Sequence, residues 1–120
     1  MQLQYLDFDV SDEESGRGSF DAMASVDPSR LPALLSEIGS VLAWAHRAFG
    51  PAGALDDEGE WDYAMQGVDE PDTPLAMAYE GNGRVRMAPA AGTARTTLTL
   101  TLSGSPAFCQ ALRDTFALGD

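Results

Sequence analysis

The chain of 120 residues carries 19 acidic residues against seven arginines, which gives a formal net charge of −12, and 44% of its residues are hydrophobic. This length and apolar content predict one globular domain, residues 1–120, with enough hydrophobic side chains to form a core. An acidic surface repels nucleic-acid phosphates and anionic lipids, so we expect neither nucleic acid nor a membrane as a partner.

The sequence also predicts a cytoplasmic location. The chain starts without a basic segment followed by an apolar stretch, and it contains no run of about 18 apolar residues that would suggest a membrane span. Its single cysteine cannot form an internal disulfide, so folding requires no oxidising compartment.

Two segments near the start alternate apolar and polar residues, Leu3–Val10 and Phe20–Val26. This period of two predicts an antiparallel hairpin with the acidic segment Ser11–Gly18 as its turn. A helix follows, with Ser29 as the expected N-cap, Pro32 in the first turn and Gly50-Pro51 at the end. Its apolar residues have helical spacing: Leu31, Leu34, Leu35, Ile38, Val41, Leu42, Ala45 and Phe49.

The opposite side of this helix is small and nearly uncharged. It consists of Ala33, Ser36, Gly39, Ser40 and Ala43. Small residues permit close backbone approach, so we expect the last helix of this chain or a second subunit to pack there. A simply exposed, alanine-rich surface is the alternative.

Four further strands are predicted in the second half: Trp61–Gln66, Leu75–Glu80, Arg84–Met87 and Thr96–Ser103. Val68–Pro74 and Pro89–Ala94 are expected loops, and Gly81-Asn82-Gly83 is an expected hairpin turn. In the last strand Leu98, Leu100 and Leu102 point to one face, whereas Thr97, Thr99 and Thr101 point to the other. This alternation indicates a sheet with one packed and one open face.

A short final helix should begin at a Ser105 N-cap with Pro106 in its first turn and should end at Gly119. Phe108, Cys109, Leu112 and Phe116 form its apolar face. The order is therefore β-β-α-β-β-β-β-α. We predict an α+β fold with a single antiparallel sheet of about six strands and two helices packed on one face.

The sequence contains no motif that predicts a catalytic residue or a cofactor. His46 is the only histidine, and Cys109 lies on the apolar side of its helix, where cysteines are usually inert. The loop residues Asp56, Glu58 and Glu60 are weak metal candidates, because the segment departs from the calcium-loop pattern.

Two functions remain open. The first is a small acidic interaction module, either a homodimer or a partner-binding protein of the inhibitor or immunity type, with Ser36, Ser40, Ala43, Trp44 and Trp61 as candidate contacts. Both tryptophans are also plausible core residues.

The second function is a small anionic-ligand-binding protein or an enzyme that uses the open sheet face. Its candidate residues are Arg84, Arg86, Thr97, Thr99 and Thr101. Two arginines on a polar face suit an anion, but cross-strand ion pairs are the competing role for them.

Overall fold

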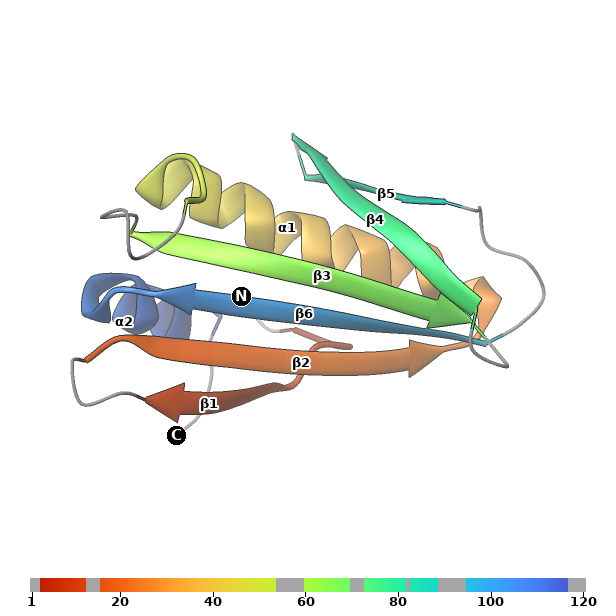
Figure 1. The fold of residues 1–120 in the computed structure, drawn as a ribbon, viewed down its shortest axis with the longest axis horizontal. Helices are drawn as coiled ribbons and strands as arrows, with labels where there is room; N and C mark the ends of the chain where they lie inside the picture. The colour runs from red at the N-terminus through yellow and green to blue at the C-terminus, as the bar shows by residue number, and fades with distance from the viewer. Residues whose placement is uncertain are drawn as a thin grey trace.

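The computed structural model describes residues 3–12, 16–53, 60–69, 73–81, 83–88 and 95–116. The elements within these ranges are β1 (Phe8–Asp12), β2 (Gly18–Val26), the 3-10 helix η1 (Pro28–Arg30), α1 (Leu31–Phe49), β3 (Trp61–Asp69), β4 (Thr73–Gly81), β5 (Arg84–Ala88), β6 (Thr96–Gly104) and α2 (Pro106–Thr115). The strands form one antiparallel sheet in the order β1-β2-β6-β3-β4-β5. Both helices lie on the same face of this sheet (Figure 1). The predicted α+β fold class is confirmed.

Strand β6 lies inside the sheet and joins its two halves. It pairs along its whole length with β2 on one side and with β3 on the other. Leu98, Leu100 and Leu102 are at most 1% exposed, whereas the threonines between them are only half-buried on the opposite face. Burying a leucine side chain stabilises a fold by roughly 2 kcal/mol. The predicted division of this strand into a packed face and an open face is confirmed.

The first strand begins later than the alternation in Leu3–Val10 predicts. β1 starts at Phe8 because the preceding backbone bonds to a helix and not to a strand. The carboxylate of Glu37 in α1 accepts hydrogen bonds from the N–H groups of residues 4–6, with N···O distances of 2.5 to 2.9 Å. A charged acceptor makes such bonds stronger than neutral ones. This contact holds the segment before β1 against α1.

The segment Val68–Pro74, predicted as a loop, lies partly within strands. β3 and β4 pair there at three positions, the last of which is Gly67 opposite Leu75. Among the described residues, the pairing of β4 with β5 begins only at Ala76. Pro74 therefore has no described strand on that side to which an N–H would donate, and a proline is tolerated there. From this last pair, β3 toward Trp61 and β4 toward Gly81 diverge. The β4–β5 hairpin therefore turns away from β3 and lies over α1 (Figure 1).

The long helix begins through a 3-10 turn, so the prediction of a Ser29 N-cap is wrong. The N–H of Arg30 donates to the carbonyl oxygen of Asp27 at 2.9 Å, and the chain is therefore already helical at Ser29. Arg30 occupies the N-cap position of α1, without a side-chain cap. Pro32 lies in the first turn, where its missing N–H is not needed.

The predicted start of α2 is confirmed, and its end comes earlier than expected. The hydroxyl of Ser105 accepts a hydrogen bond from the N–H of Phe108 at 3.2 Å, as an N-cap does. The helix ends at Thr115, with Phe116 as its C-cap residue. Gly119, the predicted end, lies outside the described residues.

Aromatic side chains connect the two helices with β3. Trp61 is 0% exposed and stacks on Phe108 of α2, with 5.7 Å between the ring centroids and 9° between the planes. Its Nε1–H donates to the carbonyl oxygen of Gly50, which follows α1, at 2.9 Å. Trp44 of α1 contacts the rings of Phe108 and Phe116. These contacts fix the helix layer at one end of the sheet.

The β4–β5 hairpin covers part of the small-residue face of α1. Gly39 is buried, and a Cβ added there would lie 1.9 Å from the carbonyl oxygen of Gly83 in the hairpin turn. Gly83 has a φ of 76°, which favours glycine, and its N–H donates to the hydroxyl of Tyr79 at 3.0 Å. The expected close backbone approach is present. At Gly39 the covering element is this hairpin, and not the last helix or a second subunit.

We therefore expect Gly39→Ala to destabilise the protein by roughly 1–3 kcal/mol, because the added methyl group must displace hairpin backbone. At an open helical position the same change stabilises a protein by up to about 1 kcal/mol. The sign of the change in stability therefore shows whether Gly39 is in close contact with the hairpin. Urea denaturation followed by circular dichroism measures the difference. Gly53→Ala is the matched control, since a Cβ there meets no atom within 4 Å. Equal or higher stability of Gly39→Ala would contradict the close contact.

Candidate functional site

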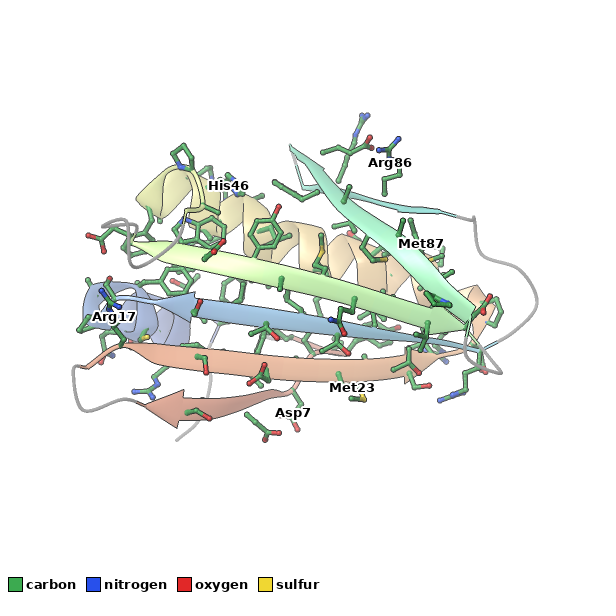
Figure 2. All side chains as sticks on the ribbon, viewed as in Figure 1. Asp7, Arg17, Met23, His46, Arg86 and Met87 are labelled. Carbon is green, nitrogen blue, oxygen red and sulfur yellow. The ribbon has the colours of Figure 1, made fainter. Side chains whose placement is uncertain are left out.

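One face of the sheet is not covered by the helices, and its outward side chains on four strands define what we call the open sheet face. They are Asp9 and Ser11 of β1, Ser19, Asp21, Met23 and Ser25 of β2, Thr97, Thr99, Thr101 and Ser103 of β6, and Asp62, Ala64, Gln66 and Val68 of β3. None of these four strands carries an arginine. Met23 is 68% exposed on this face (Figure 2). The surface is therefore rich in hydroxyl groups and acidic.

The carboxylates of this face are brought together by strand register. Asp9 lies directly opposite Asp21 on the neighbouring strand, and Asp21 lies opposite Thr101 on the next one. The hydroxyl of Thr101 donates to the carboxylate of Asp21 at 2.7 Å. Asp7 precedes β1 and takes no part in this register. The result is a pair of like charges on adjacent strands.

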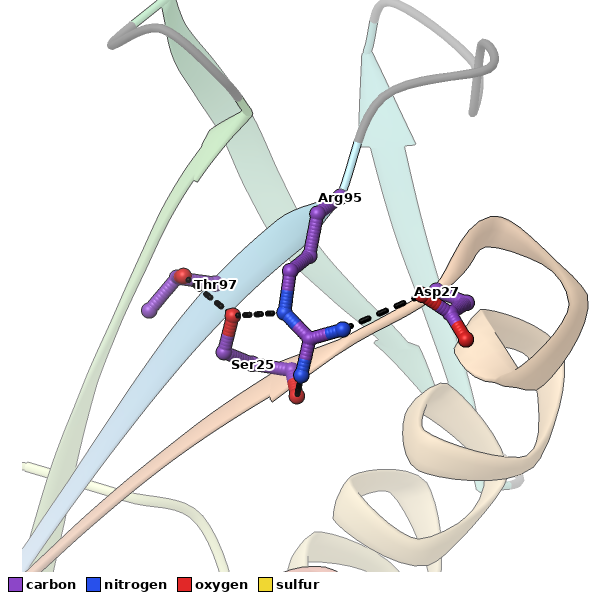
Figure 3. A network of polar contacts seen from close by, with 4 residues as sticks. All are labelled: Ser25, Asp27, Arg95 and Thr97. Carbon is purple, nitrogen blue, oxygen red and sulfur yellow. Dashed lines mark hydrogen bonds and ion pairs between the residues drawn. The ribbon is translucent and has the colours of Figure 1, made fainter.

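Arg95 lies at one end of the open sheet face (Figure 3). Its guanidinium donates to the hydroxyl and the carbonyl oxygen of Ser25 at 2.9 and 2.8 Å, and it forms an ion pair with Asp27 at 3.0 Å. The hydroxyl of Thr97 donates to the same Ser25 hydroxyl at 3.0 Å. Because Arg95 is engaged in this way, it leaves the charge in the middle of the face unchanged.

The predicted anion site does not come together around its two arginines. Arg84 and Arg86 lie on the edge strand β5, which β4 and β3 separate from the threonines of β6. Figure 2 shows Arg86 near the β5 edge of the sheet and Met23 near the opposite edge. Arg86 forms a cross-strand ion pair with Glu80 of β4 at 3.4 Å, which is the competing role considered for it. Thr97, Thr99 and Thr101 do share one face, as predicted.

The predicted partner contacts have different surroundings. Trp61 is 0% exposed and belongs to the core, so its side chain offers no surface to a partner. Trp44 is half-buried between the helices, Ser36 is exposed, and Ser40 and Ala43 are half-buried beside the β4–β5 hairpin.

The residues considered for metal binding and catalysis have structural contacts. Glu60 accepts a hydrogen bond from the Ser105 hydroxyl at 2.6 Å, while Asp56 and Glu58 lie outside the described residues. Over the described ranges no cluster of three metal-ligating side chains is present. Cys109 is 4% exposed, and its thiol donates to the carbonyl oxygen of Gly104 at 3.6 Å.

His46 lies between α1 and two strands. The centroid of its ring is 5.0 Å from that of Trp61 on β3 and 5.0 Å from that of Tyr79 on β4. Its Nδ1 lies 2.8 Å from the carbonyl oxygen of Leu42. A carbonyl oxygen can only accept, so Nδ1 carries the proton of this bond. The imidazole is thus held in one orientation, with Nε2 as its remaining nitrogen.

Two recesses flank the β4–β5 hairpin along α1. The first has a volume of about 300 Å³ and is lined by Ala43, His46, Arg47, Tyr79 and Gly81. The second has a volume of about 390 Å³ and is lined by Ser40, Ala43, Trp44, Arg47, Gly83, Thr115 and Phe116. Three predicted contacts, Ser40, Ala43 and Trp44, thus line the second recess. The first recess could not be predicted from the sequence, because it forms only where β4 diverges from β3.

No family model, no curated protein and no solved structure matches the chain. Neither described helix has the length and apolar character needed to cross a membrane.

The environment of Tyr63 yields a pH-dependent prediction. Burial raises the pKa of its phenol above 10.0, and electrostatic repulsion from the neighbouring Asp62 and Tyr79 raises this pKa further. The unfolded chain therefore loses this proton before the native protein does. The stability linked to Tyr63 is complete below pH 10.0 and declines as the pH rises through the raised pKa of the native state.

Titration of the three tyrosines by absorbance at 295 nm should therefore show a late component that Tyr63→Phe removes. Tyr5→Phe, the control, lowers the total amplitude and leaves this late component in place. If the late component persists in Tyr63→Phe, the assignment is wrong.

Proposed function

We propose that the protein is a binding module that docks a basic surface of a partner protein on the open sheet face. The observation that carries this proposal is the register of Asp9 against Asp21 on a face whose strands have no arginine. Like charges directly opposite each other on neighbouring strands destabilise a sheet. A partner that supplies arginine or lysine at this point removes the repulsion between the two carboxylates. The bound state is therefore favoured over the free protein.

The same charges argue against a second copy of the chain as the occupant. Two open sheet faces packed together would bring Asp9, Asp21 and Asp62 of one copy toward those of another. The net charge of −12 adds long-range repulsion between copies, whereas it speeds the encounter with a basic protein. A basic partner is therefore favoured over the homodimer that the sequence also suggested.

The construction of the face supports recognition as well. β2, β6 and β3 pair over nine positions on both sides of β6, so the outward side chains sit on a rigid platform. Met23, which is 68% exposed, supplies an apolar contact among hydroxyl groups. Such adaptable, unbranched side chains are common at binding surfaces.

A photo-crosslinking amino acid at position 23, introduced in the cells that make the protein, tests this proposal. We expect it to capture a partner with a basic isoelectric point. The same amino acid at position 107, an exposed position on α2, should not capture that partner. Asp9→Asn/Asp21→Asn should weaken binding to the captured protein by about tenfold at low salt, close to 1.4 kcal/mol. Because this change relieves repulsion, it should not unfold the sheet.

The matched control is Glu80→Gln/Asp114→Asn, which removes the same charge at exposed positions outside the open sheet face. It should bind as the unchanged protein does. Capture of a second copy, capture of an acidic protein, equal capture from both positions or no capture at all would each contradict the proposal. Equal weakening by the two double variants would show that net charge, and not this face, determines binding.

A further inference from the structure

We propose that the recess between α1 and the end of β4 binds a small carboxylate with an apolar body. This site is separate from the open sheet face, and the inference does not depend on the partner proposed above. The recess is lined by Ala43, His46, Arg47, Tyr79 and Gly81 and has a volume of about 300 Å³. That volume lies at the lower end of the range for ligand sites, about 300–1,000 Å³. It suits a molecule with a single ring.

Arg47 provides the charge. Its side chain is exposed at the rim shared by both recesses, and it forms no ion pair or hydrogen bond with any described residue. A guanidinium presents two parallel N–H groups, which match the two oxygens of a carboxylate. Arg47 is therefore the group that distinguishes an acid from its neutral analogue.

His46 and Tyr79 provide walls with fixed orientation. The bond from His46 Nδ1 to the carbonyl oxygen of Leu42 and the neighbouring rings hold the imidazole in place. The hydroxyl of Tyr79 accepts from the N–H of Gly83 and so keeps its own proton available for donation. Both rings offer apolar faces and polar edges. A ring packed here would contact them while its carboxylate reaches Arg47.

The competing role for these residues is to balance the helix. His46 and Arg47 lie in the last turn of α1, where positive charge is favourable beside the free carbonyl groups. That role needs no ligand and does not distinguish a carboxylate from an alcohol. The two roles therefore separate in a binding experiment with matched probes.

Sodium benzoate is the probe, with benzyl alcohol as its uncharged match and inorganic phosphate as an anion without an apolar body. The ring protons of His46, the only histidine, give one pair of resonances that report directly on the recess. We expect benzoate at fixed pH and ionic strength to shift them saturably. Benzyl alcohol and phosphate should produce no saturable shift.

Arg47→Gln should weaken benzoate binding by at least about tenfold, since it removes the charge-assisted pair. Arg84→Gln is the matched control, because it also removes one positive charge from an exposed arginine that has no partner among the described residues. It should bind benzoate as the unchanged protein does. The inference is overturned by the absence of a benzoate shift, by an equal response to benzyl alcohol, by preference for phosphate or by unaltered binding in Arg47→Gln.

Discussion

The burial of one side of β6 is the constraint on which the rest of the structure depends. Its leucines require cover on one face of the sheet only, and its backbone groups require partners on both edges. β2 and β3 supply the partners, and α1 and α2 supply the cover. The helices cover only the leucine side of β6, and its backbone hydrogen bonds are formed along its two edges. The threonine side therefore remains outside the core. The open sheet face is therefore a consequence of how the leucines of β6 are buried and its backbone groups are hydrogen-bonded.

The elements that sequence reasoning predicted well are those whose patterns are local. Alternation in Thr96–Ser103 and the Ser105 cap depend on neighbours within a few residues, and both are found in the structure. The errors have non-local causes. The carboxylate of Glu37 accepts hydrogen bonds from the N–H groups that would have extended the first strand. Pro74 is acceptable in a strand because the described part of β5 does not reach it. No short window of sequence contains either fact.

The same distinction explains what was predictable about the candidate sites. The small residues around Gly39 predicted a close approach, and a close approach is present, but the sequence did not identify the hairpin turn at Gly83 as the approaching element. Arg84 and Arg86 are exposed and alternate with the half-buried Val85 and Met87, as the sequence predicted. The strand order nevertheless separates them from the threonines of β6. Similarly, the recess beside His46 depends on the divergence of β4 from β3. Strand order and divergence are properties of the assembled sheet, not of its individual strands.

The position of β6 also determines when the protein can fold during its synthesis. Of the described strands, β6 is the last to leave the ribosome, although it lies between β2 and β3. Until it arrives, those two strands have no partner on their inner edges. Thr101, the register partner of Asp21 in β6, lies 80 residues away in the chain. Contacts of such long range slow folding and leave strand edges exposed meanwhile. The net charge of −12 opposes association of such exposed edges between copies of the chain, because like charges repel.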